Sequence, residues 1–325
     1  MGRAAGLFAL MCIAGALAGC GPRLPEFPLA RLTVAVVDDD GNPVPGARVG
    51  VVGTELPARG MTDAAGRFVA TLHNPDSQVE LQADKKGYYG VNRQFYLFTG
   101  ATNGQWFPWN PLLELRVHKI GAPVPMFVKE VQSDLPVLNQ PIGFDLAIGD
   151  WVQPHGRGLT NDFIFEGSRR LVDDMEYSGT LTLTFPSPSD GLILMSLPGR
   201  DDFELRLAAM APSEGYINHR TFELGSRKSP ETGYRDEHRS FSEADNYYFR
   251  VRSRTNGQGT VTSAWYGKIY RGIHYVVGNL STNANTHVNA GVRFQYFLNP
   301  DGTRNTEFDT RSNLCADPGA AGGRP

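Results

Sequence analysis

Short alternating segments set off by turn residues are the feature that most constrains what this chain can fold into. Residues 31–38 (RLTVAVVD) alternate apolar and less apolar side chains, and residues 39–43 (DDGNP) follow as a turn signal. The same alternation recurs at residues 180–185 and 292–300. A period of two is typical of strands with one buried face, and no window shows a long 3.6-residue period. We therefore expect an all-β protein.

The length and turn content predict two antiparallel β-sandwich domains. A chain of 325 residues is long enough for about two domains. We place the first sandwich, with an immunoglobulin-like architecture, at residues 31–120. A Gly/Pro cluster at residues 121–125 marks the boundary between the two domains. A larger sandwich or jelly roll is then expected over residues 121–316, followed by a flexible tail at 317–325.

Residues 1–19 have the layout of a secretory signal peptide. Arg3 precedes an apolar run that extends from Ala4 to Ala18 and contains no acidic residue. The run is shorter than the roughly 20 residues that a transmembrane helix needs. We therefore expect export through the general secretion route.

The end of this signal, Leu17-Ala18-Gly19-Cys20, resembles the bacterial lipobox. The resemblance implies cleavage before Cys20 and acylation of its thiol and amine, with the membrane as a partner through the lipid. Gly21 stands where an Asp commonly retains lipoproteins at the inner membrane, which favours an outer-membrane location. Prolines recur through residues 20–30, so this stretch is predicted to be an extended tether.

Cysteine usage agrees with this processing. Cys12 would leave with the signal and Cys20 would carry lipid, so only Cys315 would remain as a thiol. No intramolecular disulfide is then available to the mature chain.

Four separate stretches of the first domain carry a second resemblance. Residues 36–38, 41–47, 62–68 and 83–88 resemble, in the same order, the turns and strands of the carboxypeptidase regulatory-like domain. The family implies a seven-stranded transthyretin-like fold that serves as an accessory module without catalytic residues. In the second domain, stretches such as residues 143–165 resemble uncharacterised bacterial secreted proteins, which implies architecture and no mechanism.

The motif search weakens the common enzyme classes. Gly-x-Ser-x-Gly, Ser-x-x-Lys, His-Glu-x-x-His and Cys-x-x-Cys are all missing from the sequence. The formal charge of −3 argues against nucleic acid as a partner. No cofactor and no metal are expected. Residues 38–42 could offer oxygen ligands to calcium, although Asp and Asn before Pro favour a simple turn.

One acidic, glycine-rich segment is the best candidate for a ligand site. The candidate residues within residues 143–165 are Asp145, Asp150, Trp151, His155 and Asp162. Carboxylates and an aromatic ring could hold a sugar, or two carboxylates could act on a polysaccharide. Alternatively, the aspartates cap their own loop and the tryptophan belongs to the core.

Two further features leave alternatives open. The aromatic residues Trp106, Trp109, Tyr88 and Tyr89 could form an exposed platform for a ligand, or could fill the seam between domains. The charged stretch at residues 225–246 is predicted to be a solvated loop, with docking of a partner as the alternative. The function expected overall is a lipid-anchored, non-enzymatic binding or structural module for a glycan, peptide or envelope protein. The alternative is a polysaccharide-active enzyme or a carbohydrate-binding-like domain that uses residues 143–165.

Overall fold

The computed structural model describes residues 27–173, 176–196, 207–277 and 290–316. Every regular element in these ranges is a β-strand, so the all-β prediction is confirmed. Within them, no helix has the length and apolar character needed to cross a membrane. The predicted signal peptide, the lipidated Cys20 and the tail at 317–325 lie outside the described residues.

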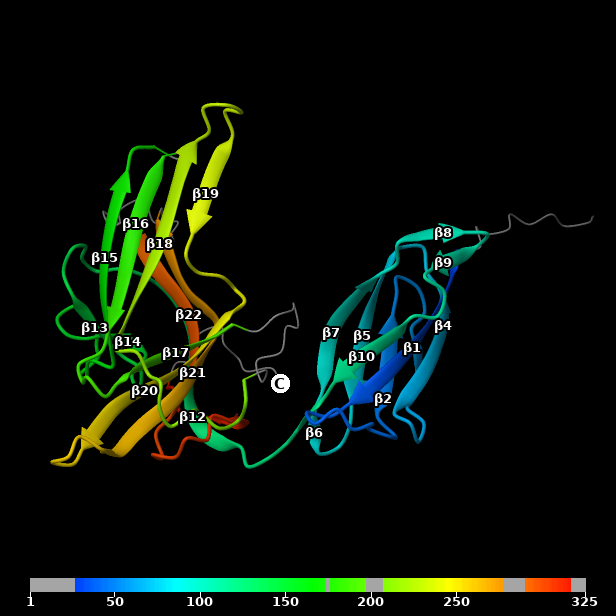
Figure 1. The fold of residues 1–325 in the computed structure, drawn as a ribbon, viewed down its shortest axis with the longest axis horizontal. Helices are drawn as coiled ribbons and strands as arrows, with labels where there is room; N and C mark the ends of the chain where they lie inside the picture. The colour runs from blue at the N-terminus through cyan, green and yellow to red at the C-terminus, as the bar shows by residue number, and fades with distance from the viewer. Residues whose placement is uncertain (1–26, 174–175, 197–206, 278–289, 317–325) are drawn as a thin grey trace, which may run out of the picture.

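The first group of strands, which we call the N-terminal sandwich (residues 27–119), packs two sheets face to face (Figure 1). The first sheet is built on β1, which pairs antiparallel with β4 and parallel with β10 and β9. Its strands are β1 (Leu29–Val37), β4 (Arg67–His73), β8 (Gly100–Thr102), β9 (Gln105–Phe107) and β10 (Leu112–Arg116). The second sheet contains β2 (Arg48–Val52), β3 (Ala58–Met61), β5 (Gln78–Asp84) and β7 (Val91–Leu97). A small pair, β6 (Tyr88–Tyr89) and β11 (His118–Lys119), closes the far end.

The alternation in β1 produces the core of this sandwich. Leu32, Val34 and Val36 are fully buried, whereas the residues between them lie on the outer face. Three more strands, β7 to β9, follow β6 along the chain. The two shorter ones have three residues each, too few to display a period of two.

The second group, the C-terminal sandwich (residues 124–316), packs two six-stranded sheets. One sheet has the order β17-β20-β21-β22-β12-β23, with β12 (Val124–Asp134), β17 (Gly191–Ser196), β20 (Asp245–Thr255), β21 (Val261–Val277), β22 (Ala290–Asn299) and β23 (Phe308–Asn313). The other has the order β14-β13-β15-β16-β18-β19, with β13 (Ile142–Asp145), β14 (Asp150–Trp151), β15 (Phe163–Leu171), β16 (Tyr177–Thr184), β18 (His219–Lys228) and β19 (Arg235–Arg239).

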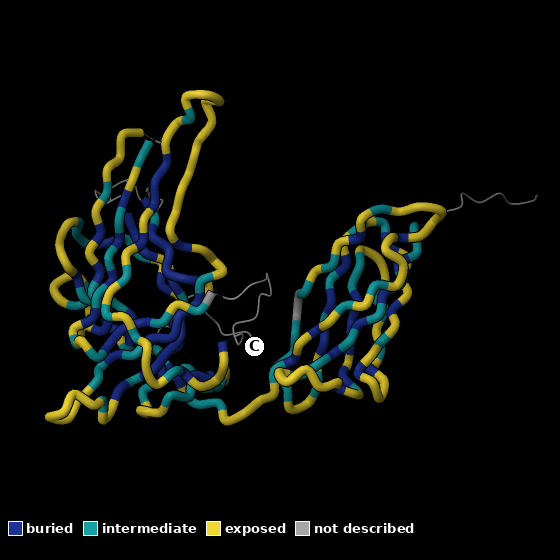
Figure 2. Tube along the Cα trace, viewed as in Figure 1, coloured by how far each residue is buried: buried dark blue, intermediate teal, exposed yellow. Residues whose placement is uncertain are grey.

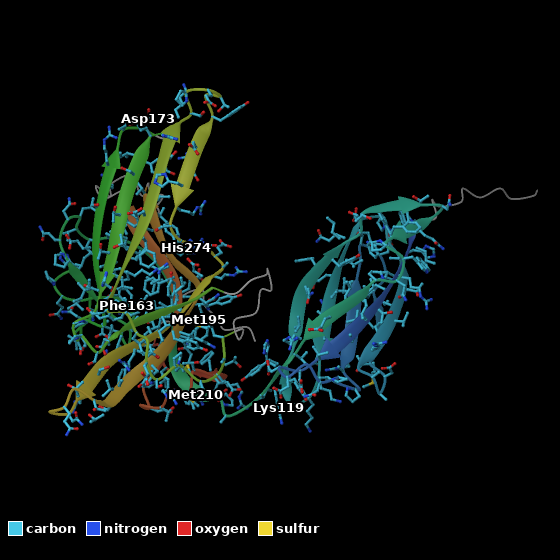
Figure 3. The ribbon with its side chains drawn as sticks, viewed as in Figure 1. Lys119, Phe163, Asp173, Met195, Met210 and His274 are labelled. Atoms are coloured by element: carbon cyan, nitrogen blue, oxygen red, sulfur yellow. The ribbon has the colours of Figure 1, made fainter. Side chains whose placement is uncertain are left out.

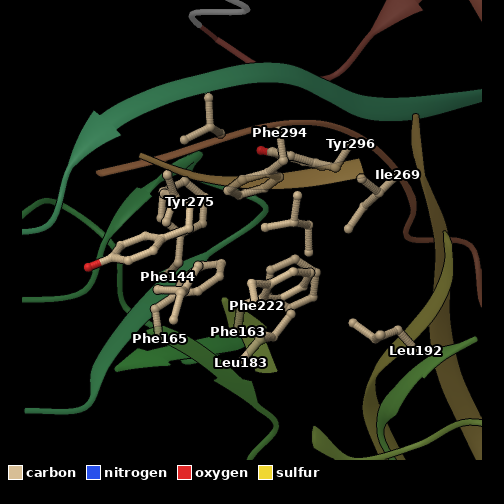
Figure 4. Close-up of a cluster of buried hydrophobic side chains, with 14 of the residues drawn as sticks. Phe144, Phe163, Phe165, Leu183, Leu192, Phe222, Ile269, Tyr275, Phe294 and Tyr296 are labelled. Atoms are coloured by element: carbon tan, nitrogen blue, oxygen red, sulfur yellow. The ribbon is translucent and has the colours of Figure 1, made fainter. Parts of the chain in front are cut away.

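Aromatic side chains fill the space between these two sheets (Figure 4). The predicted inward face of β22 is confirmed, because Val292, Phe294, Tyr296 and Leu298 are all at most 2% exposed. Phe163 packs edge-on against neighbouring rings with centroids 5.2–6.0 Å apart. Such edge-to-face pairs add to the stabilisation from area burial alone.

Half of residues 225–246 is strand, where the sequence predicts a solvated loop. β18 runs to Lys228 and pairs antiparallel with β19 in a hairpin that extends beyond the core. All five residues of β19 are exposed (Figure 2). The sequence of β19 (RDEHR) has no apolar face, so the pattern that marks a strand is missing. Pairing with β18 makes it a strand.

The two sandwiches are joined through one buried carboxylate, Glu307, which is 5% exposed. Its Oε1 accepts hydrogen bonds from Tyr89 Oη (2.9 Å) and from the Gly121 N–H (2.7 Å), and its Oε2 accepts one from the Ala122 N–H (2.8 Å). Asn305 Nδ2 donates to the Ala122 carbonyl at 2.6 Å. Burial and the neighbouring carboxylate raise the pKa of Tyr89, which keeps it a donor. We call this arrangement the Glu307 joint. Its linker residues, Gly121 and Ala122, come shortly after Lys119, which is labelled in Figure 3.

Candidate functional site

The candidate segment forms a compact loop at one end of the C-terminal sandwich. β13 and β14 make a short hairpin, and the chain then returns to β15. We call residues 145–162 the aspartate loop. Gly158 lies against the backbone here, because a Cβ at this position would meet the carbonyl oxygens of Asp150 and Trp151 at 2.9 Å. Glycine therefore lets the loop fold back on its own hairpin.

Asp145 holds both ends of this loop. Its Oδ1 accepts from the N–H groups of Ala147 (3.0 Å) and Ile148 (3.3 Å). Its Oδ2 accepts from the N–H groups of Leu159 and Thr160, both at 3.0 Å. Four backbone donors that would otherwise lack a partner are satisfied by one carboxylate.

Arg252 completes the arrangement from β20. Its Nε and Nη2 donate to the two oxygens of Asp162 at 2.7 and 2.8 Å, and Nη2 also donates to Asp145 Oδ1 at 3.0 Å. The aspartate side chains are 0% and 3% exposed, and the arginine side chain is 24% exposed. The pairing is a buried ion triad with bidentate geometry.

No sequence pattern connects Arg252 with the aspartates, since it lies ninety positions beyond Asp162. The only local signal is structural. Arg252 has a positive φ of 55° at an irregularity in the pairing of β20 with β21, and its guanidinium stacks over Trp265 at 4.2 Å. The bulge turns this side chain toward the aspartate loop.

Electrostatics fit a structural role for this triad. Burial raises the pKa of Asp162, and the guanidinium of Arg252 opposes that shift. Burial likewise works against the charge on Arg252, but the two carboxylates raise its pKa overall. Each ion is the counter-ion that makes burial of the other tolerable.

Asp150 lies outside the triad and is used locally. Its Oδ1 accepts from the Trp151 N–H at 2.8 Å, and its Oδ2 accepts from the N–H and Nε of Arg157 at 3.0 and 3.2 Å. Burial would raise the pKa of Asp150, but these donors lower it overall. His155 is exposed and does not join the aspartates.

Trp151 is a core residue rather than a sugar platform. It is 4% exposed, and its Nε1 donates to Ser133 Oγ at 2.8 Å. Its ring packs edge-on against Phe144 and Phe165 at 5.2 and 5.9 Å. Both faces of the indole are therefore inside the sandwich, where no ligand could stack.

Trp106 and Trp109 do not form one platform. Trp106 is 9% exposed and belongs to the N-terminal core, where its Nε1 donates to the Asn74 carbonyl at 2.9 Å. Trp109 is 38% exposed, and Phe107 beside it is 40% exposed. Neither tryptophan lies at the seam between the sandwiches, where Tyr89 makes the contact instead.

The described residues contain no group of three or more His, Cys, Asp or Glu side chains placed to hold a metal ion. Residues 38–42 form the simple turn: Asp38 Oδ1 accepts from the N–H groups of Asp40 and Asn42 at 3.1 and 2.8 Å. Cys315 forms no disulfide within the described part of the chain and is half-buried. The structure thus gathers Asp145 and Asp162 into one cluster, but uses their carboxylates to close the loop.

Comparison with known families identifies part of the chain. The carboxypeptidase regulatory-like domain matches residues 31–106, which lie within the N-terminal sandwich. This supports the resemblance seen in the turns and strands of that region. A search of curated proteins gave no match.

Solved structures resemble this chain only weakly. Catechol 1,2-dioxygenase from Acinetobacter sp. ADP1 is 10% identical, with a TM-score of 0.24, and covers 30% of this chain. This chain spans about half, 54%, of the dioxygenase. The shaft pilin SpaA from Lactobacillus rhamnosus GG is 10% identical over 70% of this chain and 89% of the pilin, with a TM-score of 0.22.

A candidate carbohydrate-binding protein from Bacteroides uniformis is 9% identical over 81% of this chain and 95% of its own, with a TM-score of 0.20. At such scores these likenesses carry no functional argument.

Proposed function

We propose that the protein is a lipid-anchored, non-enzymatic envelope protein that binds a protein or peptide partner through its C-terminal sandwich. The observation that carries this proposal is the contrast between two charged regions. The carboxylates of Asp145 and Asp162 already accept hydrogen bonds from backbone N–H groups and from Arg252. The side chains of β19 are all exposed.

Lipid anchoring at the outer membrane rests on the lipobox-like sequence that ends at Cys20. Two or more acyl chains hold a protein stably on a bilayer, where a single chain is marginal. The N-terminal sandwich, with its regulatory-like domain, serves in this proposal as the spacer between the membrane and the C-terminal sandwich.

The partner surface that we propose is the β18–β19 hairpin together with Val172 and Asp173, which follow the neighbouring strand β15. The two lie side by side because Tyr177 pairs with Ser226 in the sheet register. Tyr234, in the hairpin turn, is 77% exposed, and Val172 is 54% exposed. Asp173 is labelled in Figure 3. Tyrosine is enriched in protein interfaces relative to the rest of the surface.

The ion pairs on the surface of the hairpin could be replaced by ion pairs with a partner. Arg227 pairs with Asp236 at 3.2 Å, and Arg235 pairs with Glu237 at 3.1 Å. Exposed pairs of this kind contribute little to folding, so a partner can replace one member at low cost. β19 is also the edge strand of its sheet, which leaves backbone groups open for strand addition.

Photo-crosslinking in the native envelope tests this function. A photoreactive residue replaces Tyr234, and a matched control replaces Leu159 in the aspartate loop, which is 72% exposed. We expect one dominant protein adduct from position 234 and none from position 159. Adducts of equal pattern from both positions would sink the proposed surface.

The enzyme alternative is tested separately with Asp145→Asn. If the chain turns over a polysaccharide, this variant loses turnover while some of it remains folded. Turnover by the unaltered chain, lost in the folded fraction of the variant, would overturn the non-enzymatic proposal.

A further inference from the structure

One end of the N-terminal sandwich is organised around a buried side chain, Asn74, which is 0% exposed. Its N–H donates to the Pro28 carbonyl at 3.1 Å, and its Oδ1 accepts from the Thr54 N–H at 2.9 Å. Its own carbonyl accepts from Trp106 Nε1 at 2.9 Å. The incoming chain, the β2–β3 turn and β9 therefore meet at the same end. We call this the entry end.

Two more hydrogen bonds bring other segments to the entry end. The Leu29 N–H donates to the Gly104 carbonyl in the β8–β9 turn, and the Phe98 N–H donates to the Ser77 carbonyl, both at 2.8 Å. In Figure 1, β8 and β9 lie at this end of the sandwich, and β6 lies at the other.

Large apolar side chains project from the segments that meet here. The four are Leu56 (83% exposed), Leu97 (63%), Phe107 (40%) and Trp109 (38%). They come from three separate stretches of the sequence, so no single local pattern explains them. Leaving this much apolar surface in water is unfavourable unless something covers it.

The opposite end of the same sandwich has a different character. Its turns carry Asp38 to Asp40, Asp63, Lys85 and Lys86. Met61 (63% exposed) and Ile120 (39% exposed) are the large apolar side chains there. That end leads into the Glu307 joint and the C-terminal sandwich.

We infer that the entry end rests on a lipid bilayer, with the four apolar side chains in its interfacial region. The inference depends on the proposed lipid at Cys20. Phe27 lies seven positions after Cys20, and seven residue steps span at most about 25 Å even when fully extended. The lipid thus keeps this end, and not the charged end, beside the membrane. Trp and Phe are suited to the boundary between headgroups and acyl chains.

The charges at this end specify the kind of contact. Glu55 and Asp76 are exposed here, and Asp76 is hydrogen-bonded to the Thr54 hydroxyl. A surface with these acidic groups does not seek anionic lipids. The contact is apolar insertion, and its strength does not increase with the content of anionic lipid.

Fluorescence on vesicles tests the inference. Residues 1–20 are replaced by a hexahistidine tag, and the otherwise complete chain is tethered to phosphatidylcholine vesicles that contain a chelating lipid. Cys315→Ser removes the native thiol, and Leu56→Cys carries an NBD fluorophore. Met61→Cys, at the charged end, is the matched control.

We expect NBD emission at position 56 to shift to the blue on vesicles and to be quenched by lipids with brominated acyl chains. Emission at position 61 should match that of the free protein. Added anionic lipid should leave both spectra unchanged. Equal emission at the two positions, or a shift that requires anionic lipid, would overturn the inference.

A separate measurement isolates the anchor itself. The full-length chain and its Cys20→Ala variant are expressed in a Gram-negative host, and their flotation with membranes is compared. Equal flotation would refute the lipid anchor of the proposed function, whereas the vesicle spectra report on the entry end whichever way flotation turns out.

Discussion

The aspartate loop and the β18–β19 hairpin are both rich in charge, but they use charge in opposite ways. In the loop, two carboxylates turn inward to one arginine and to backbone N–H groups. In the hairpin, all five residues of β19 are exposed, and charged side chains such as Arg235 and Glu237 pair with each other on the surface. The same residue types therefore hold a fold together in one place and leave a surface open in the other.

The difference teaches that density of charge does not locate a binding site. What distinguishes the two regions is the number of buried donors that each carboxylate must satisfy. Asp145 accepts hydrogen bonds from four backbone donors and one guanidinium. The Asp236 carboxylate, in contrast, pairs with a single exposed Arg227.

The largest expected effect is from Arg252→Ala. Removing the guanidinium leaves two buried carboxylates without their counter-ion, which typically costs about 3–5 kcal/mol. Urea unfolding at pH 7 measures the change, and Arg227→Ala in the hairpin is the matched control. A loss below about 1 kcal/mol, on the scale of an exposed pair, would remove the contrast between the two regions.

A smaller loss is expected from Asp145→Asn. The asparagine amide has only one oxygen that can accept. Its NH₂ group would therefore replace one carboxylate oxygen, and the backbone N–H groups that now donate to that oxygen would lose their acceptor. Hydrogen bonds to a charged group are worth about 1.5–3 kcal/mol, and we expect a cost of about 2 kcal/mol in thermal or urea unfolding. Stability equal to that of the unaltered chain would show that the loop closes without this charge.

Asp150→Asn should have a pH-dependent cost. Although burial opposes ionisation, the Arg157 and Trp151 donors hold the folded pKa below its usual value of 3.8. The stabilisation is thus present above that value and is lost as the pH falls through the folded pKa. We expect a cost of about 1 kcal/mol at pH 7. Urea unfolding should show this cost shrinking toward zero in strong acid, and a cost that grows on acidification would contradict the assignment.

The smallest effect on folding is expected in the hairpin. Tyr234→Ala changes an exposed side chain at the turn and should alter the free energy of unfolding by less than about 0.5 kcal/mol. Crosslinking or binding to the partner should nevertheless fall. A variant that unfolds more easily but binds as before would reverse the roles that we assign to the two regions.

Much of the fold could be predicted from alternation alone, because burial on one face imposes a period of two. The inward faces of β1 and β22 are examples. β19 could not be found this way, since it buries no face and depends on pairing with β18. β8 and β9 are too short for a pattern, although Trp106 in β9 proves to be a core residue.

The candidate site shows the same limit. Asp145 and Asp162 could be grouped from sequence because they flank one loop. Their partner Arg252 could not, since a strand pairing far along the chain brings it there. Without that cation, a ligand site and a self-closed loop have the same sequence signature. Trp151 illustrates this as well, because an aromatic residue beside aspartates suits a sugar pocket and a core equally.

The Glu307 joint restricts how the C-terminal sandwich can rotate relative to the N-terminal sandwich. A flexible linker would let the C-terminal sandwich move through a large volume. The effective concentration of its surface at any fixed partner would then be low. Here one carboxylate takes both linker amides and the Tyr89 hydroxyl, so few rotations remain at this point. On a membrane-tethered chain, that restriction raises the effective concentration of the hairpin at one height above the bilayer and lowers it elsewhere. The protein would then select partners by their distance from the membrane as well as by their chemistry.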